Sequence, residues 1–354
     1  NTMPSHDPPD VFGLHPLADV KLRRDQANEI FQKIIDIQPK ESAVGGMTRE
    51  DLVLQKIKEL LPNVPQNFQM ERVRSLVDSR GKKPLDICCK QEIERMQVVL
   101  TALRSTLTDL ELAIDGSIVM NDQLYNSMNS IYDGRIPDHW KKISWPAENL
   151  KDWFEQVRLR YDQYAKWIET GRLDAYWLGG MFNPGGFLTS LRQSTCRSHG
   201  SSWSLNDTYL MSEVQSFARG QNPSDKDKDG PKEFVYLRGI YLEGARWGKG
   251  MTSNQQSAWG LTELQTSTGR GKQGGKPVTD LRNEMPLIKV WAVKRDQKNK
   301  EYLFSTTSDI YVCPVYKNST RTDLNYVFDI PLKSLNANIR AKHWVMRGVC
   351  LTTI

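Results

Sequence analysis

A glycine- and lysine-rich run at residues 269–276, GRGKQGGK, comes nearest in composition to a nucleotide-binding loop. A P-loop has the pattern G-x-x-x-x-G-K followed by Ser or Thr, because the lysine contacts the phosphates and the hydroxyl holds magnesium. Here Gly275 occupies the position of the lysine, and Pro277 follows Lys276 in place of the hydroxyl residue. We therefore interpret the run as a solvated basic loop and expect no cofactor to bind within this chain.

Cysteine and histidine side chains could ligate a metal, and Cys196 and His199 have a suitable spacing. A zinc site needs four ligands, however, and no second pair lies nearby in the sequence. The five histidines are scattered, and no serine stands in the strand-turn-helix context of a nucleophile elbow. The sequence therefore predicts neither a catalytic residue nor a metal site, which argues against an independent hydrolase.

The composition limits what kind of protein could position such residues. A chain of 354 residues with 38% hydrophobic and 25% charged side chains is typical of a globular protein with about two domains. No apolar run approaches the ~18–20 residues that cross a bilayer, so we expect no membrane partner. Five irregularly spaced cysteines favour a reducing compartment. Residues 1–10 are polar, Pro-rich and without an initiator Met, which suggests a segment of a longer polypeptide.

Aromatic residues and charge divide the sequence near residue 140. Residues 1–139 contain five of the 32 aromatic side chains and no tryptophan, and their net charge is −4. Residues 140–354 contain the other 27 and have a net charge of +10. Together with the apolar period described next, this contrast predicts an α+β fold. We expect a linker over residues 1–18, a helical subregion over 19–170 and a mostly-β subregion over 171–354.

One long helix near residues 85–115 is the strongest local prediction. Pro84 suits its first turn, and Gly116 suits a left-handed C-terminal cap. Between them, apolar residues alternate spacings of four and three, which forms an a/d seam. We interpret the seam as buried in a helical bundle, with a dimerising coiled coil as the alternative. Its members are Ile93, Met96, Leu100, Leu103, Leu107, Leu110 and Ile114.

Other segments with a 3.6-residue apolar period predict further helices. Thr48 and Asp51 form a capping-box pattern before one of them. These predicted helices span about residues 19–38, 48–61, 73–77, 122–132 and 150–170.

After Leu173 the apolar period changes to two, which predicts strands. Because the expected strands follow one another without intervening helices, we expect an antiparallel β-barrel. They lie near residues 234–242, 287–293, 301–304, 310–316, 324–332 and 344–351. Residues 183–186 predict a tight turn before a short helix at 187–193. Residues 222–231 and 249–277 are polar, and we expect the first to be a loop and the second a mobile insertion.

The excess of basic residues in the second part leaves one alternative function open. A stand-alone basic β-domain could bind a polyanion, such as nucleic acid, or an acidic protein partner. Its Lys and Arg residues are spread over all the expected strands and loops, however, so we favour a simply basic surface and expect no nucleic-acid partner.

Ordered motifs over residues 12–351 resemble one family, the C-terminal region of dynein heavy chains. They include FGLHP at 12–16, DLELAIDG at 109–116, WLGGMFNP at 177–184, LEGA at 242–245 and YVCPVYK at 311–317. The signature residues, which we expect to be structural, are Phe12, Gly13, His15, Trp177, Asn183, Pro184, Gly186, Phe187, Gly244, Tyr311, Cys313, Pro314, Tyr316, His343, Trp344, Arg347 and Gly348.

The resemblance implies a role without catalysis in this segment. It implies a helical subregion and a β-barrel that lie against the AAA+ motor ring and tune a minus-end-directed microtubule motor. ATP or ADP and magnesium would bind in upstream modules of the same heavy chain. Intermediate and light chains, other heavy chains and microtubules would be partners through the parent complex, in the cytoplasm and cytoskeleton.

Two short motifs resemble a particular branch of the family. Residues 182–184 (FNP) and 321–326 (RTDLNY) are most similar to axonemal outer-arm heavy chains of the gamma type, which implies a ciliary or flagellar axoneme. Three features depart from the family pattern: Gly179, Gly185 and the length of the 249–277 stretch.

Overall fold

The fold is described from a computed structural model of the protein. It describes residues 17–37, 47–215, 233–251, 257–263, 286–305, 309–318, 321–336 and 338–353. The protein divides into two compact units. Unit 1 comprises residues 1–37, 174–179 and 184–354, and unit 2 comprises residues 38–173 and 180–183.

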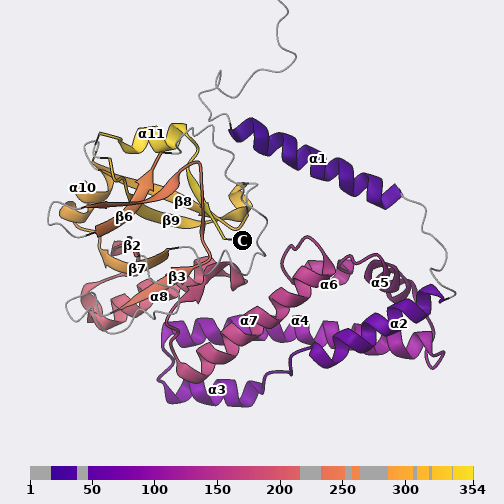
Figure 1. Ribbon diagram of the computed structural model, residues 1–354. Helices are drawn as coiled ribbons and strands as arrows, with labels where there is room; N and C mark the ends of the chain where they lie inside the picture. Colours follow the sequence, from indigo (N-terminus) through magenta and orange to yellow (C-terminus); the bar gives the residue numbers. More distant parts are fainter. Residues whose placement is uncertain are drawn as a thin grey trace, which may run out of the picture. The chain divides into compact units, whose positions relative to one another are not determined.

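Unit 2 is a helical bundle built around α4, a helix of 31 residues (Figure 1). The helix α4 contacts α2, α3, α5, α6 and α7, so it forms the centre of the bundle. The elements are α2 (Arg49–Leu60), the 3-10 turn η3 (Leu61–Asn63), α3 (Met70–Ser79), α4 (Pro84–Ile114), α5 (Asp122–Tyr132), α6 (Asp138–Ile143) and α7 (Leu150–Thr170).

Local signals fix where these helices begin and end. The Thr48 side chain accepts from the Asp51 backbone N–H, and the Asp51 carboxylate accepts from the Thr48 backbone N–H, which forms the predicted capping box. Helix α4 begins at Pro84, and Gly116, just beyond it, has a φ of 82°. Gly171 ends α7 with a φ of 75°. The helices predicted in this part of the sequence are confirmed, because their termini depend on neighbouring residues alone.

The seam of α4 is buried within its own unit. Its members from Ile93 to Leu110 have no exposed surface, and Ile114 at the end of the helix is half-buried. These six fully buried side chains leave no seam surface for a second copy of the protein, so the coiled-coil alternative is wrong. Burying each leucine or isoleucine contributes roughly 1.5–3 kcal/mol to stability.

Unit 1 holds two mixed sheets in the described residues. The first has the strand order β1-β3-β7-β2-β6-β5, and the second has the order β4-β10-β8-β9. The strands are β1 (Tyr176–Trp177), β2 (Thr208–Gln215), β3 (Phe234–Arg238), β4 (Tyr241–Glu243), β5 (Arg246–Met251), β6 (Ser257–Thr262), β7 (Leu287–Lys294), β8 (Ile310–Tyr316), β9 (Tyr326–Lys333) and β10 (Cys350–Thr352).

The expectation of an antiparallel barrel is wrong. The pairs β1–β3 and β8–β10 are parallel, and within the described part of unit 1 neither sheet closes on itself. Strand β2 packs against β9, and a bridge joins Leu261 to Ser334, but β1 and β5 end the first sheet and β4 ends the second. Alternation along a strand indicates which side chains face a core, whereas closure depends on which distant strands pair.

Helices α10 and α11 lie between strands of unit 1, contrary to the expectation of strands without intervening helices, and unit 1 also contains α8 and several 3-10 turns. These helices and turns are α8 (Pro184–Ser198), α10 (Gln297–Phe304), α11 (Ala341–Met346) and the 3-10 turns η4 (Leu178–Gly180), η5 (Gly200–Ser202), η6 (Leu205–Asp207) and η7 (Asp323–Asn325). Helix α8 confirms the short helix predicted at 187–193, but it begins at Pro184, so residues 184–186, which were predicted as part of a tight turn, form its first turn.

Two segments predicted as strands are helical. Residues 301–304 belong to α10, where Asp296 caps the helix and accepts from the Asn299 backbone N–H. Leu303 is buried against Met211 and Ile310, whereas Glu301 and Ser305, two positions away on either side, are exposed, so the segment does not follow a two-residue period. Residues 344–346 belong to α11, and strand β10 begins only at Cys350.

Part of the predicted loop at 249–277 is also regular structure. Strands β5 and β6 pair as an antiparallel ribbon, with Gly248 opposite Gly260. A Cβ atom at Gly260 would lie 2.4 Å from the Lys333 carbonyl oxygen, so glycine permits this close backbone approach. Residues 252–256, residues 264–277 and the predicted loop at 222–231 lie outside the described residues, as do Phe12, Gly13 and His15.

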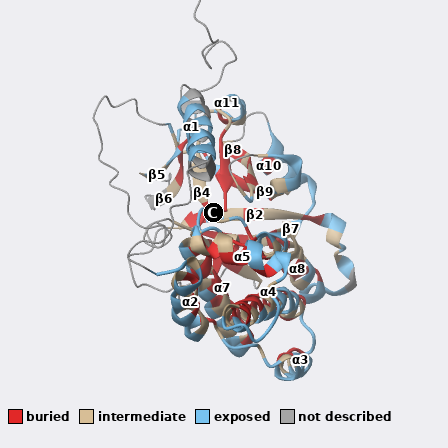
Figure 2. Cartoon of the chain, turned by 90° about the vertical axis from the view of Figure 1, so that its right-hand side faces the viewer, coloured by how far each residue is buried: buried red, intermediate tan, exposed pale blue. Residues whose placement is uncertain are grey.

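Helix α1 (Leu17–Ile37) presents an exposed apolar stripe. Val20, Ile30, Phe31 and Ile34 are 49–63% exposed, and the described part of α1 has the colour of exposed residues in Figure 2. No helix of the described residues is both long enough and apolar enough to cross a membrane.

Candidate functional site

Some of the sequence-predicted signature residues of unit 1 meet at the turn between α11 and β10, at residues 347–350; they are Gly244, Tyr311, Arg347 and Gly348. Gly348 ends α11 with a φ of 60°. Tyr311 of β8 donates its hydroxyl to the Val349 carbonyl oxygen at 2.7 Å. A Cβ atom at Gly244 would lie 3.0 Å from the Arg347 carbonyl oxygen. The turn is thus held by residues more than thirty positions away in the sequence.

An arginine from a distant loop completes this turn. The Arg321 guanidinium donates to the Gly348 carbonyl oxygen at 2.8 Å and to the Glu243 carboxylate at 2.6 Å. Arg321 has a φ of 52°, in the left-handed region that costs a non-glycine residue about 1–3 kcal/mol. Neither Arg321 nor Glu243 was among the predicted site residues, because their pairing spans 78 positions.

The remaining signature residues of unit 1 take structural positions. Arg347 pairs with Glu263 at 3.1 Å, and the His343 Nε2 atom lies 2.9 Å from the same oxygen. The other signature residues of unit 1 lie in its core, in α8 or in β8. Trp177, Phe187, Cys313 and Trp344 are buried, Pro184 is buried in the first turn of α8, Gly186 lies within α8, and Pro314 and Tyr316 lie in β8.

Cys196 and His199, the pair with the spacing of metal ligands, both make contacts that do not involve a metal. Cys196 is buried in α8, and burial raises the pKa of its thiol, which disfavours the thiolate that a metal needs. The His199 ring stacks on Trp203 at 4.1 Å, and its Nδ1 atom lies 2.9 Å from the Thr195 carbonyl oxygen. Among the described residues, no three His, Cys, Asp or Glu side chains are placed to hold a metal ion.

A stack of tryptophans forms the aromatic core of unit 2. Trp153 lies between Trp140 and Trp145, with ring centroids 5.1 and 5.7 Å apart. The buried Arg160 guanidinium lies 4.0 Å from the Trp145 ring centroid. A cation over an aromatic face in a desolvated site contributes about 2 kcal/mol. The stack therefore ties α6 and α7 together.

The hydrogen bonds of the Thr106 hydroxyl in this core indicate which ring nitrogen of His139 carries a proton. The Thr106 hydroxyl donates to the Ala102 carbonyl oxygen at 2.7 Å and accepts from the Trp140 indole N–H at 3.2 Å. The His139 Nε2 atom lies 2.8 Å from the same oxygen. Because the one hydroxyl proton is already used, His139 carries a proton on Nε2 and donates it. Burial lowers the pKa of His139 despite the nearby Asp138.

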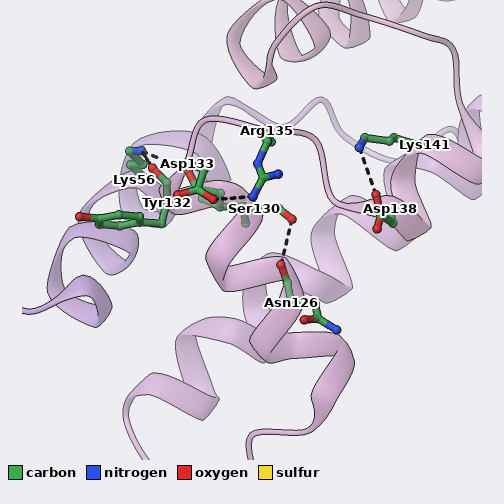
Figure 3. A network of polar contacts seen from close by, with 9 residues as sticks. Lys56, Asn126, Ser130, Tyr132, Asp133, Arg135, Asp138 and Lys141 are labelled. Carbon is green, nitrogen blue, oxygen red and sulfur yellow. Dashed lines mark hydrogen bonds and ion pairs between the residues drawn. The ribbon is translucent and has the colours of Figure 1, made fainter. Parts of the chain in front are cut away.

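Helix ends in unit 2 are held by basic side chains. Lys56 of α2 donates to the carbonyl oxygens of Ile131 and Tyr132, at 3.1 and 2.9 Å, at the C-terminus of α5 (Figure 3). Arg80 donates to the Glu169 carbonyl oxygen at 2.9 Å and lies 3.5 Å from the buried Asp86 carboxylate. A cation at a helix C-terminus also meets the negative end of the helix dipole.

A carboxylate at the edge of the α4 seam holds the signature residue Asn183. Glu92 is 1% exposed, and it accepts the backbone N–H groups of Phe182 and Asn183 at 2.6 and 2.9 Å. Sequence reasoning missed Glu92, although a charge directly before the seam residue Ile93 was a signal that something pairs with it. A cavity of about 390 Å³ lies beside it, lined by α4 from Cys88 to Val98 and by Asn183.

Comparisons with known proteins match nearly the whole sequence. The family model for the C-terminal domain of the dynein heavy chain matches residues 24–353. The protein is 36% identical to mouse dynein axonemal heavy chain 5 over 353 residues, which is 99% of its length. It is 37% identical to the Chlamydomonas reinhardtii dynein gamma chain of the flagellar outer arm over 354 residues, or 98% of its length. It spans about 7% of the length of each of these relatives.

Proposed function

This protein belongs to the family of C-terminal domains of dynein heavy chains, and on that premise we propose that it is the C-terminal domain of an axonemal outer-arm heavy chain. It works in the ciliary or flagellar axoneme, as part of an ATP-driven motor that moves toward microtubule minus ends. ATP and magnesium bind in upstream modules of the heavy chain. This segment performs no catalysis and acts through contact with the AAA+ ring of its own heavy chain.

The observation that carries the proposal is the match along almost the entire sequence. The family model covers residues 24–353, and the relatives with the higher identities are an axonemal and an outer-arm heavy chain. The exposed stripe on α1 supports action by contact. Ile30, Phe31 and Ile34 leave about half of their surface open, as residues at a docking face do. Within this proposal, residues 1–18 link the domain to the ring, and residues 19–170 and 171–354 form its helical and mostly-β subregions.

Accessory partners follow from the same premise. Other heavy chains and the intermediate and light chains of the outer arm share the complex with this domain, and microtubules are bound elsewhere in the heavy chain. The proposal assigns this segment neither a nucleic-acid partner nor a membrane partner.

Two truncations of the heavy chain test the contact role. A heavy chain that ends at Asn183 keeps unit 2 complete, because residues 180–183 belong to it. We expect ATP hydrolysis to persist while stall force, run length or the microtubule-stimulated rate changes, since coupling energies between sites are typically ~1–3 kcal/mol. A second truncation before Asp19 removes the bundle as well and is expected to impair folding of the motor.

The readouts are ATPase activity and single-molecule motility. Motility of the Asn183 truncation identical to that of the full heavy chain would show that residues 184–354 tune nothing. Complete loss of ATPase in that truncation would show that residues 184–354 maintain the ring and do not adjust it.

A further inference from the structure

Glu92 makes three hydrogen bonds that use both of its carboxylate oxygens. Its Oε1 atom accepts from the Asn183 backbone N–H at 2.9 Å. Its Oε2 atom accepts from the Phe182 backbone N–H at 2.6 Å and lies 3.0 Å from the Tyr164 hydroxyl. Burying a carboxylate is costly unless such donors surround it, and two consecutive backbone amides facing one carboxylate form a bidentate arrangement.

Tyr164 of α7 extends the same hydrogen-bond arrangement to Gly180, the first residue of the segment 180–183. Its hydroxyl lies 2.6 Å from the Gly180 carbonyl oxygen, so one proton is shared between Gly180 and Glu92. Burial, followed by the charge of Glu92, raises the pKa of Tyr164 well above its usual range. The hydroxyl therefore remains a donor, and residues 180–183 are bound at both ends by two side chains of the helical bundle.

The segment 180–183 has an unusual place in the sequence. Its four residues belong to unit 2, whereas the residues before it (174–179) and after it (184–354) belong to unit 1. Residues 180–183 are therefore a second attachment of the polypeptide to unit 2, in addition to the covalent continuation of α7. Three of the four residues are held through backbone atoms, by Glu92 and Tyr164.

The cavity beside Glu92 provides space into which residues 180–183 could move away from the carboxylate. It has a volume of about 390 Å³, and Asn183 forms part of its wall. The rest of the wall comes from α4, including the exposed Glu94, Arg95 and Val98. Movement of Asn183 into this space displaces no seam side chain, because the seam residues lie on the buried side of α4.

We propose that Glu92, supported by Tyr164, is a positioning residue that latches residues 180–183 onto the helical bundle. With the latch closed, the polypeptide is attached to unit 2 by the end of α7 and by the latch. Without the carboxylate, the second attachment opens while the bundle stays folded. The latch is a property of this protein and does not rest on the proposed motor function.

Hydrogen exchange of the backbone amides tests the latch in the 354-residue protein. Glu92→Gln keeps the size of the side chain but turns an amide NH₂ toward one of the two backbone N–H donors. We expect the amides of Phe182 and Asn183 to exchange at least tenfold faster, with the amides of α4 unchanged. Glu94→Gln removes the same charge from the same helix, beside the same cavity, and is expected to leave exchange at 182–183 unchanged.

A second variant keeps the test decisive if Glu92→Gln folds poorly. Tyr164→Phe removes only the hydroxyl, and we expect faster cleavage at residues 180–183 by a non-specific protease without a change in exchange of the α4 amides. Glu92→Asp, which retains the carboxylate, should partly restore protection. Equal exchange in wild type and Glu92→Gln, an equal effect of Glu94→Gln, or acceleration along all of α4 would each overturn the proposal.

Discussion

Units 1 and 2 use left-handed glycines of the same conformation in different surroundings. Gly116 follows α4 with a φ of 82°, and a Cβ atom there would meet nothing within 4 Å. Gly244 follows β4 with a φ of 79°, and a Cβ atom there would lie 3.0 Å from the Arg347 carbonyl oxygen and 3.2 Å from Val349. In the bundle the glycine serves the local turn alone, whereas in the sheets it also admits a distant backbone.

The same contrast runs through both cores. The bundle depends on side chains that one helix presents at regular spacing, as the fully buried seam of α4 shows. The sheets depend on contacts between distant segments, such as Tyr311 with Val349 and Arg321 with Gly348. Side-chain deletion should therefore be the sharpest perturbation of unit 2, and added volume at close backbone contacts the sharpest perturbation of unit 1.

The largest effect is expected from Leu103→Ala. Leu103 lies in the middle of the seam with no exposed surface, so the truncation loses buried area and leaves a cavity. We expect a loss of roughly 2–5 kcal/mol in the free energy of unfolding. Urea unfolding measures it, and Val98→Ala on the same helix, at a side chain 55% exposed, is the control. A loss below ~0.5 kcal/mol for Leu103→Ala would contradict the buried seam.

The glycine pair gives the next largest effect and tests the comparison directly. Gly116→Ala should cost about 1 kcal/mol, because an L-residue pays only for the left-handed conformation. Gly244→Ala should cost roughly 2–4 kcal/mol, because crowding against the Arg347 and Val349 backbone adds to that strain. Thermal unfolding of both variants measures the difference. Equal losses of stability in the two variants would show that the Arg347 and Val349 backbone moves away from residue 244 at no cost. The contrast between the two units would then be wrong at this position.

The smallest effect concerns the pH dependence of unit 2. Burial lowers the pKa of His139, so the unfolded protein takes up this proton more readily than the folded one. Stability from this residue is therefore present above the ordinary histidine pKa, about 6.5, and declines as pH falls below it.

His139→Gln isolates this contribution, since glutamine keeps a donor near the Thr106 hydroxyl but does not titrate. We expect the urea midpoint of the wild type to fall more between pH 7 and pH 5 than that of the variant. The same pH slope in both proteins would mean that His139 is protonated equally in the folded and unfolded states.

The resemblance and the helical part of the fold were accessible from the sequence. The family suggested by the ordered motifs is confirmed by the family-model match over residues 24–353. Pro84 and Gly116 predicted the ends of α4, Thr48 and Asp51 predicted the cap of α2, and the spacing of apolar residues predicted the buried face of α4. Each of these depends on hydrogen bonds and contacts between residues a few positions apart, so a short window of sequence contains the information.

Only the tertiary structure decided how the strands pair and which polar groups are buried together. The parallel pairing of β8 with β10 replaces the antiparallel arrangement that alternation suggested, and residues 301–304 form a helix whose Leu303 is buried against Met211 and Ile310. Glu92 meets Phe182 and Asn183 across about ninety residues. Such contacts form when folding brings distant segments together, so no local pattern of residue types specifies them.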